Sequence, residues 1–142
     1  MWFWYAISAS ILWGIGYVIN QLLMRNFSAI EILLFESFII LLIFIPYFIF
    51  TGQLKPTLIK LLDWKIVLLI LAGSFIYICA AIFILKSIGS SNATLAAIIE
   101  ASYPIFTMFF AYILIGEVQF TISTIIGCLL IISGLVVVHA GH

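Results

Sequence analysis

Residues 93–115 read ATLAAIIEASYPIFTMFFAYILI, and this stretch decides the fold class. Its one charged side chain is Glu100. An α-helix of about 20 apolar residues crosses a hydrocarbon core about 30 Å thick. A transmembrane β-strand would be about half as long and would alternate polar with apolar side chains, which this stretch does not do. The stretch therefore predicts a helix that spans a membrane.

Four more stretches of the same kind occur in the chain. They cover residues 2–24, 30–50, 66–85 and 118–138. We therefore expect an all-α integral membrane protein in which residues 1–142 form one domain, a bundle of five transmembrane helices. Between the second and third stretches, Leu58, Leu61 and Leu62 share one helical face, which predicts a short helix in the membrane interface.

The composition of the whole chain supports this class. Of 142 residues, 67% are hydrophobic and 7% are charged, whereas soluble domains have about 25% charged residues. Lipid must therefore solvate most of the surface. Five basic and five acidic residues leave no net charge to attract nucleic acid. Cys79 and Cys128 lie in apolar stretches without neighbouring ligands, so we expect free thiols and no metal site.

Two acidic side chains lie within the predicted spans, Glu36 and Glu100. An ionisable group at membrane depth costs about 2.5–3.5 kcal/mol on insertion scales, which makes such a residue a candidate for function. From the rise of a helix, Glu100 and Tyr17 both lie about 10 Å inside the same membrane face. Glu36 and Tyr77 fall near this depth, so we expect the four side chains to converge in one layer.

Small and polar side chains recur at helical spacing on three of the predicted helices. Such faces line either a cavity or a tight helix interface. We favour a cavity that binds substrate or coupling ion, because a carboxyl beside aromatic rings can hold a cation or carry a proton. In the alternative, Glu100 is neutral and holds helices together through a tyrosine. The cavity interpretation assigns Glu100, Tyr103, Trp13, Tyr17, Asn20 and Tyr77 as main residues, and Glu36 and Thr107 as secondary ones.

Two further features concern the shape of helices. Pro104 has no backbone N–H and should kink the fourth helix, leaving a carbonyl near Glu100 free. Ser123, Gly127 and Gly134 form a small-residue seam on the last helix, which predicts close packing within the chain or between subunits. Glu117 is expected to complement the dipole at the start of that helix.

Several short motifs occur in the order that one family shows. They are Trp13-Gly14, residues 90–93, Pro104, residues 114–117 and residues 126–134. Together they resemble one EamA-like unit of the drug/metabolite transporter superfamily. The resemblance implies transport of small organic solutes, with a central cavity lined by the first, third and fourth helices of each unit. It also implies that these five helices are half of a 5+5 inverted-repeat fold. Family members often carry Arg near the position of Glu36, so a role of that Arg does not transfer.

We therefore interpret the chain as a secondary transporter protomer that moves a small organic metabolite or cation by alternating access, coupled to protons or ions. The sequence contains no nucleotide-binding or cofactor motif, so we expect no cofactor and no enzyme activity. The rival interpretation is a non-transporting structural or regulatory membrane subunit of a larger complex. We expect location in the inner membrane of a prokaryotic cell.

The expected partners are membrane lipid, a small-molecule substrate and a second copy of the chain. Five spans place Lys55, Lys60 and Lys65 on one side of the membrane and Arg25 and Lys86 on the other. Cytoplasmic loops normally carry a clear excess of Lys and Arg, which sets the orientation of a membrane protein. Three basic residues against two are too small a difference to set one orientation. The chain should then insert in both orientations and form an antiparallel homodimer, with a parallel dimer or a different partner chain as the alternatives.

Overall fold

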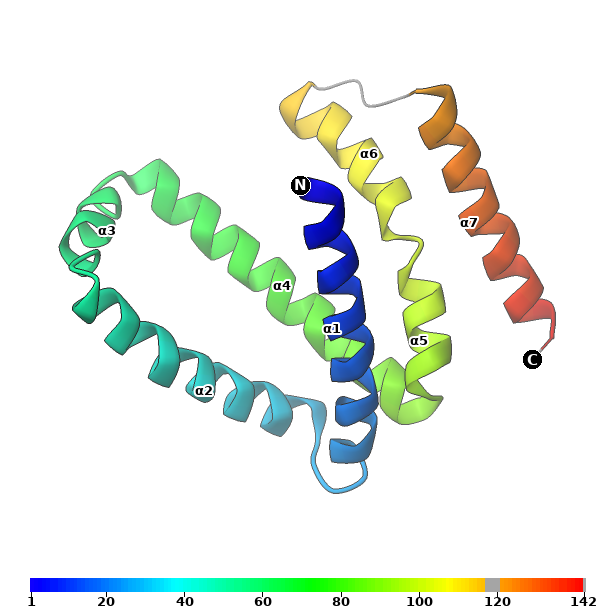
Figure 1. Ribbon diagram of the computed structural model, residues 1–142, viewed down its shortest axis with the longest axis horizontal. Coiled ribbons are helices and arrows are strands. Elements are labelled where there is room, and N and C mark those ends of the chain that lie inside the picture. The colour runs from blue at the N-terminus through cyan, green and yellow to red at the C-terminus, as the bar shows by residue number, and fades with distance from the viewer. Residues whose placement is uncertain (117–120, 142) are drawn as a thin grey trace. The chain divides into compact units, whose positions relative to one another are not determined.

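A computed structural model describes residues 1–116 and 121–141 of the chain (Figure 1). All regular structure in these residues is helical. The elements are α1 (Trp2–Leu23), α2 (Ala29–Phe50), α3 (Leu54–Lys60), α4 (Trp64–Ser90), α5 (Ala93–Glu100), α6 (Tyr103–Ile115) and α7 (Ile122–Ala140).

Five segments of these residues are long and apolar enough to cross a membrane: α1, α2, α4, the span Ala93–Ile115 and α7. The protein is therefore an integral membrane protein, and the predicted all-α, five-span class is confirmed. The third span is longer than predicted, since α4 extends beyond residues 66–85 at both ends. Hydropathy detects only the apolar middle of such a helix, because the polar turns at its ends carry no apolar signal. The predicted start of the last helix at residue 118 and Glu117 lie outside the described residues.

The chain divides into two compact units. One unit, called here the Glu100 unit, comprises Met1–Ile19 and Ser90–His142, and the other comprises Asn20–Gly89. The Glu100 unit contains most of α1 together with α5, α6 and α7, whereas the second unit contains the end of α1 and helices α2 to α4.

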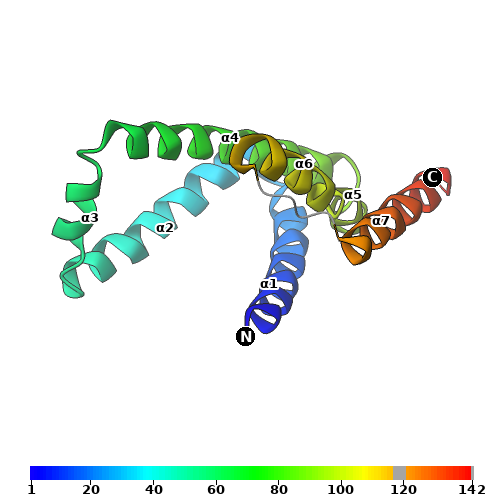
Figure 2. The same cartoon turned by 90° about the horizontal axis from the view of Figure 1, so that it is seen from above.

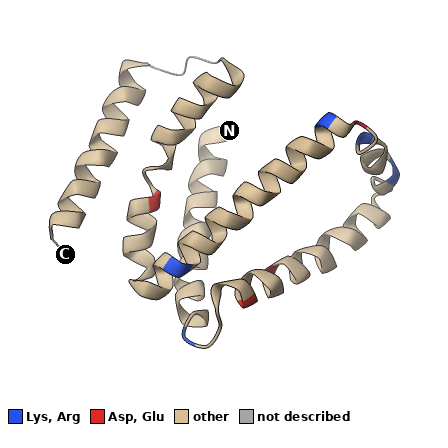
Figure 3. Cartoon of the chain, turned by 180° about the vertical axis from the view of Figure 1, so that it is seen from behind, with Lys and Arg blue, Asp and Glu red and all other residues tan. Residues whose placement is uncertain are grey.

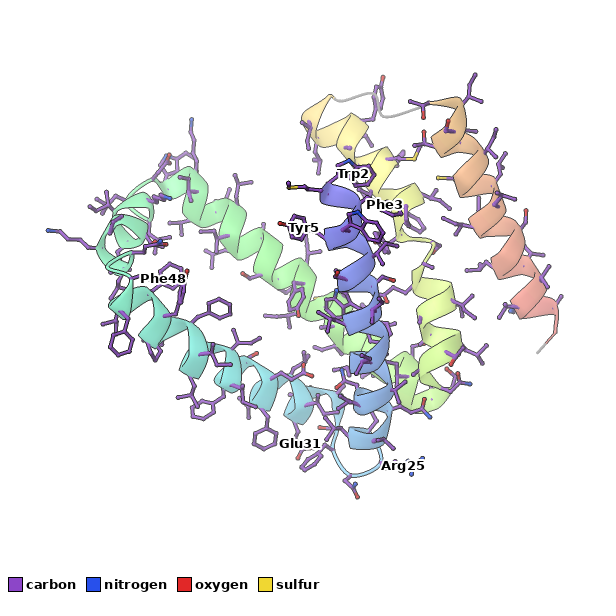
Figure 4. The ribbon with its side chains drawn as sticks, in the orientation of Figure 1. Trp2, Phe3, Tyr5, Arg25, Glu31 and Phe48 are labelled. Carbon is purple, nitrogen blue, oxygen red and sulfur yellow. The ribbon has the colours of Figure 1, made fainter. Side chains whose placement is uncertain are left out.

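In the second unit, a capping box starts α2. The Ser28 hydroxyl accepts a hydrogen bond from the Glu31 backbone N–H. The Glu31 carboxylate in turn accepts from the Ser28 N–H at 2.8 Å and from its hydroxyl at 2.7 Å. Figure 4 shows Arg25 and Glu31 on the two sides of the turn before α2. The Glu31 carboxylate is thus engaged in starting this helix.

The small core of the second unit lies where α2 and α4 meet. Ala29, Ile32 and Leu85 are buried there, and a Cβ on Gly89 would come within 2.6 Å of the Met24 methyl carbon. Figures 1 and 2 show α2 and α4 approaching one another at this end and separating toward α3, which links their other ends. A short helix between these two spans was expected from the leucine spacing, and α3 is such a helix, but it ends at Lys60, so Leu61 and Leu62 lie beyond it.

In the Glu100 unit, α5 contacts α7, and the thiol of Cys128 on α7 lies 3.5 Å from the sulfur of Met108 on α6. Cys79 and Cys128 are both free thiols, as predicted.

Figure 3 shows how few charged residues the helices carry. Most large apolar side chains outside the small buried clusters are exposed, which is what lipid-facing helices require, since lipid tails are as apolar as leucine.

Candidate functional site

The fourth membrane span is interrupted beside Glu100. Helix α5 begins after Asn92, whose side-chain oxygen accepts a hydrogen bond from the Leu95 N–H at 2.9 Å. It ends at Glu100, and α6 begins at Tyr103 with Pro104 in its first turn. A continuous helix would direct the N–H of residue 104 at the Glu100 carbonyl, but proline has no N–H. The interruption therefore leaves the carbonyl end of α5 next to the Glu100 side chain.

Glu100 is joined to α1 through Tyr17. The Tyr17 hydroxyl donates a hydrogen bond to Oε2 of Glu100, and both residues belong to the same unit. Tyr17 is buried, with 9% of its surface exposed, and Glu100 is half-buried. Trp13, one helical turn before Tyr17, packs against it with ring centroids 5.8 Å apart. Two elements distant in the sequence thus place a carboxylate, a phenol and an indole side by side.

A cavity of about 330 Å³, open on one side, lies between α1 and α5; Tyr17 of this pair lines it, whereas Glu100 does not. Its volume is near the lower end of the range for small-molecule sites, about 300–1,000 Å³. A Cβ on Gly14 would meet no atom within 4 Å, so this glycine leaves open space in the cavity wall. The lining residues are Gly14, Tyr17 and Val18 of α1 and Ala93, Thr94, Ala97 and Ile98 of α5. Ala97 precedes Glu100 by one turn on the same face, so the row of small residues on α5 leads to the carboxylate.

The charge of this unit is one-sided. All five Lys and Arg residues of the chain lie within residues 20–89, so residues 1–19 and 90–142 contain none. Glu100 therefore has no lysine or arginine partner in its own unit. Its carboxylate is held there by the neutral hydroxyl of Tyr17.

The structure brings together three of the predicted site residues, Trp13, Tyr17 and Glu100. Tyr103 and Thr107 lie on α6, where the Thr107 hydroxyl donates to the Tyr103 carbonyl at 3.1 Å. Neither residue lines the cavity, and the Tyr103 side chain is 63% exposed.

The remaining predicted residues lie elsewhere. Asn20, Glu36 and Tyr77 belong to the second unit, so their convergence on Glu100 stays a prediction. On α7, a Cβ on Gly127 or Gly134 would meet no atom within 4 Å. Among the described residues, no helix packs closely on the predicted seam, and its contact with another subunit stays a prediction.

Part of the cavity wall was not assigned from the sequence. Gly14 was noted only as part of a motif, although it precedes Tyr17 by three residues and so shares its face. Thr94 is a polar residue near Ala93 and Ala97, and this spacing could have revealed it. Val18 and Ile98 have no such signal, because a large apolar side chain in a membrane helix looks the same whether it faces lipid or a cavity.

In residues 1–116 and 121–141, no group of three or more His, Cys, Asp or Glu could hold a metal ion.

The model of the EamA-like transporter family matches residues 1–140. No curated protein and no solved structure matches the chain. The matched residues include all five spans. The chain belongs to the EamA-like transporter family of the drug/metabolite transporter superfamily.

Proposed function

We propose that the chain is the protomer of a secondary transporter in the inner membrane of a prokaryotic cell. It moves a small organic metabolite or cation by alternating access, coupled to protons or ions. The observation that supports this proposal is the hydrogen-bonded Tyr17–Glu100 pair beside a cavity of about 330 Å³ in a membrane span. Ionisable residues at membrane depth commonly mark substrate and ion pathways.

The interrupted span supports the coupling role. In many secondary transporters, discontinuous helices direct free carbonyls and helix C-terminal ends at a coupling cation. Here α5 ends at Glu100, and the negative end of its dipole lies next to the carboxylate. Both features favour a proton or another cation at this position over an anion. Binding and release of that cation at Glu100 is the coupling step we propose.

We further propose that the transporter works as a homodimer, with the antiparallel arrangement favoured. Most family members carry two such units in one polypeptide in inverted orientations, and a second copy would supply the missing half. The seam of Ser123, Gly127 and Gly134 on α7, where Ser123 and Gly134 are exposed and Gly127 is half-buried, offers a surface for close helix approach.

Substitution of Glu100 by glutamine tests the proposed function. We would reconstitute the purified chain into vesicles that contain a pH-sensitive dye and add a panel of amines, amino acids and other small metabolites. We expect at least one solute to cause proton movement through the wild type but not through Glu100→Gln, since an amide side chain does not take up a proton at the pH of the assay. Glu100→Asp should retain the pH dependence at a lower rate, because it keeps the carboxylate but shortens its reach.

Two outcomes would count against the proposal. Uptake through Glu100→Gln with the pH dependence of the wild type would exclude Glu100 as the coupling group. A purified chain that moves no solute and forms no pairs, yet assembles stably with another membrane protein, would favour the regulatory-subunit alternative.

A further inference from the structure

We infer that the cavity between α1 and α5 takes a small organic cation with an apolar body. Its positive group would lie beside Glu100, and its alkyl substituents would fill the space in front of Gly14. This inference rests on the proposed transport function and names the substrate class. It is carried by the absence of lysine and arginine from the Glu100 unit, together with the chemistry of the cavity wall.

The charge of the unit selects against anions. A substrate carboxylate or phosphate is normally held by Arg or Lys through charge-assisted hydrogen bonds, and residues 1–19 and 90–142 contain neither. An anion would also approach the Glu100 carboxylate and the negative end of α5. A cation would instead supply the positive charge that Lys and Arg do not supply in the Glu100 unit.

The cavity wall selects for an apolar body. Val18, Ala93, Ala97 and Ile98 contribute aliphatic surface, and the Thr94 hydroxyl is the polar group added from α5. A strongly hydrated solute would lose most of its hydrogen bonds on entering this wall, whereas methyl or methylene groups would lose none. The open space in front of Gly14 leaves room for such groups.

Tyr17 connects the two halves of the site. It lines the cavity, and its hydroxyl holds one oxygen of the carboxylate. Its aromatic ring, backed by Trp13 at a centroid distance of 5.8 Å, can attract a cation through its π face. We therefore assign Tyr17 as a positioning residue for Glu100 and as a contact for the cation.

Two molecules of the same shape test the inference. Choline carries a trimethylammonium group, and 3,3-dimethylbutan-1-ol has a carbon atom in place of the charged nitrogen. Titration calorimetry on the purified full chain should show choline binding more tightly by on the order of tenfold, the contribution of one favourable cation contact. In Glu100→Gln this preference should disappear while the alcohol binds as it does to the wild type.

A pair of glycines on one helix supplies the matched control. Gly14→Leu should abolish binding of both molecules, because the new side chain fills the cavity. Gly16→Leu introduces the same side chain two residues away, also into open space but outside the cavity lining. It should leave both affinities unchanged. Binding of choline or the alcohol that survives unchanged in Gly14→Leu would contradict the assignment of this cavity.

The outcomes separate the substrate class from the transport function. Equal affinity for choline and the alcohol, no binding of either, or a preference that survives in Glu100→Gln would overturn the cation site. If an anionic solute then caused proton movement, the proposed transport function would be supported and only the cation site would be rejected. A choline preference that depends on Glu100, in a chain that moves no solute across vesicles, would support the site and remove the transport function.

Discussion

The contact between Tyr17 and Glu100 is the smallest part of the site and the easiest to test alone. Helical rise predicted that both residues lie at the same depth, and the hydrogen bond between them agrees with that estimate. The pair could bind a ligand or could only hold α1 against α5, and the effect of removing the hydroxyl on stability and on ligand preference distinguishes these two roles. A hydroxyl that mainly holds helices together should affect stability more than ligand preference.

Tyr17→Phe removes the hydroxyl and keeps the ring. We expect a loss of about 0.6 kcal/mol in stability and at most about 1.7 kcal/mol, the average and the maximum measured for interhelical hydrogen bonds in a membrane protein. Thermal melting in detergent would measure it, with Tyr5→Phe on the same helix, where the side chain is 73% exposed, as the control without effect. In a Glu100→Ala background the same substitution should have little effect. A full loss in that background would mean that the hydroxyl acts through another partner.

The interruption of the fourth span is the main feature at the scale of elements. Sequence analysis predicted one kinked helix over residues 93–115, and the structure has two helices separated by Ala101 and Ser102. A missing N–H at Pro104 can be read directly from the sequence. How the chain adjusts to the missing N–H cannot be read from the sequence, because a proline within a helical stretch can either kink the helix or end it.

Pro104→Ala restores the N–H that a continuous helix would direct at the Glu100 carbonyl. We expect the variant to fold about as well as the wild type, because Pro104 lies in the first turn of α6, where neither proline nor alanine is disfavoured. Its transport should fall, because that carbonyl is no longer free to face a cation. Uptake into vesicles and melting temperature would be measured together. Pro46→Ala, which replaces the proline inside α2, is the matched control and should leave uptake unchanged. Unchanged uptake in Pro104→Ala would show that the interruption has no role in transport.

The seam on α7 gives a second prediction for an element. A Cβ at Gly127 or Gly134 would meet no atom within 4 Å among the described residues, so we expect the protomer to fold normally when leucine replaces either glycine. The dimer should weaken, since leucine prevents the close backbone approach that small residues allow. Size-exclusion chromatography in detergent would measure the shift toward monomer. Val136→Leu lies on the opposite face of α7 and should leave the size unchanged. Dimers of normal stability in both glycine variants would place the interface elsewhere.

At the scale of the whole molecule, the sequence predicted the class and the number of spans, because hydropathy depends only on composition along the chain. It did not predict which helices form a unit. Leucine and isoleucine face lipid and neighbouring helices equally well, so the partners of a membrane helix leave little trace in its sequence. Tyr17 and Glu100 could be assigned to the candidate site from the sequence, because polar groups at membrane depth need a partner. Val18 and Ile98 could not, because an apolar side chain at this depth needs no polar partner.

Orientation in the membrane is the last property that the charges predict. Three basic residues on one side, Lys55, Lys60 and Lys65, face two on the other, Arg25 and Lys86. Such a balance should let the chain insert both ways, and two opposed copies would form the inverted 5+5 arrangement. Reporter fusions after His142, one active only inside the cell and one only outside, should both give signal. Signal from one fusion alone would falsify dual topology.

Charge added at one turn should then control the ratio of the two signals. Ser28 caps α2, so the lysines belong upstream of it, as Asn26→Lys with one lysine inserted beside it. Arg25 and Lys86 then become part of a set of four basic residues against three, which should place the turn inside the cell in most copies. The same positions filled with glutamine change length and polarity without charge and should leave the ratio at its wild-type value. An equal response to lysine and glutamine would mean that insertion of this chain is set by something other than its basic residues.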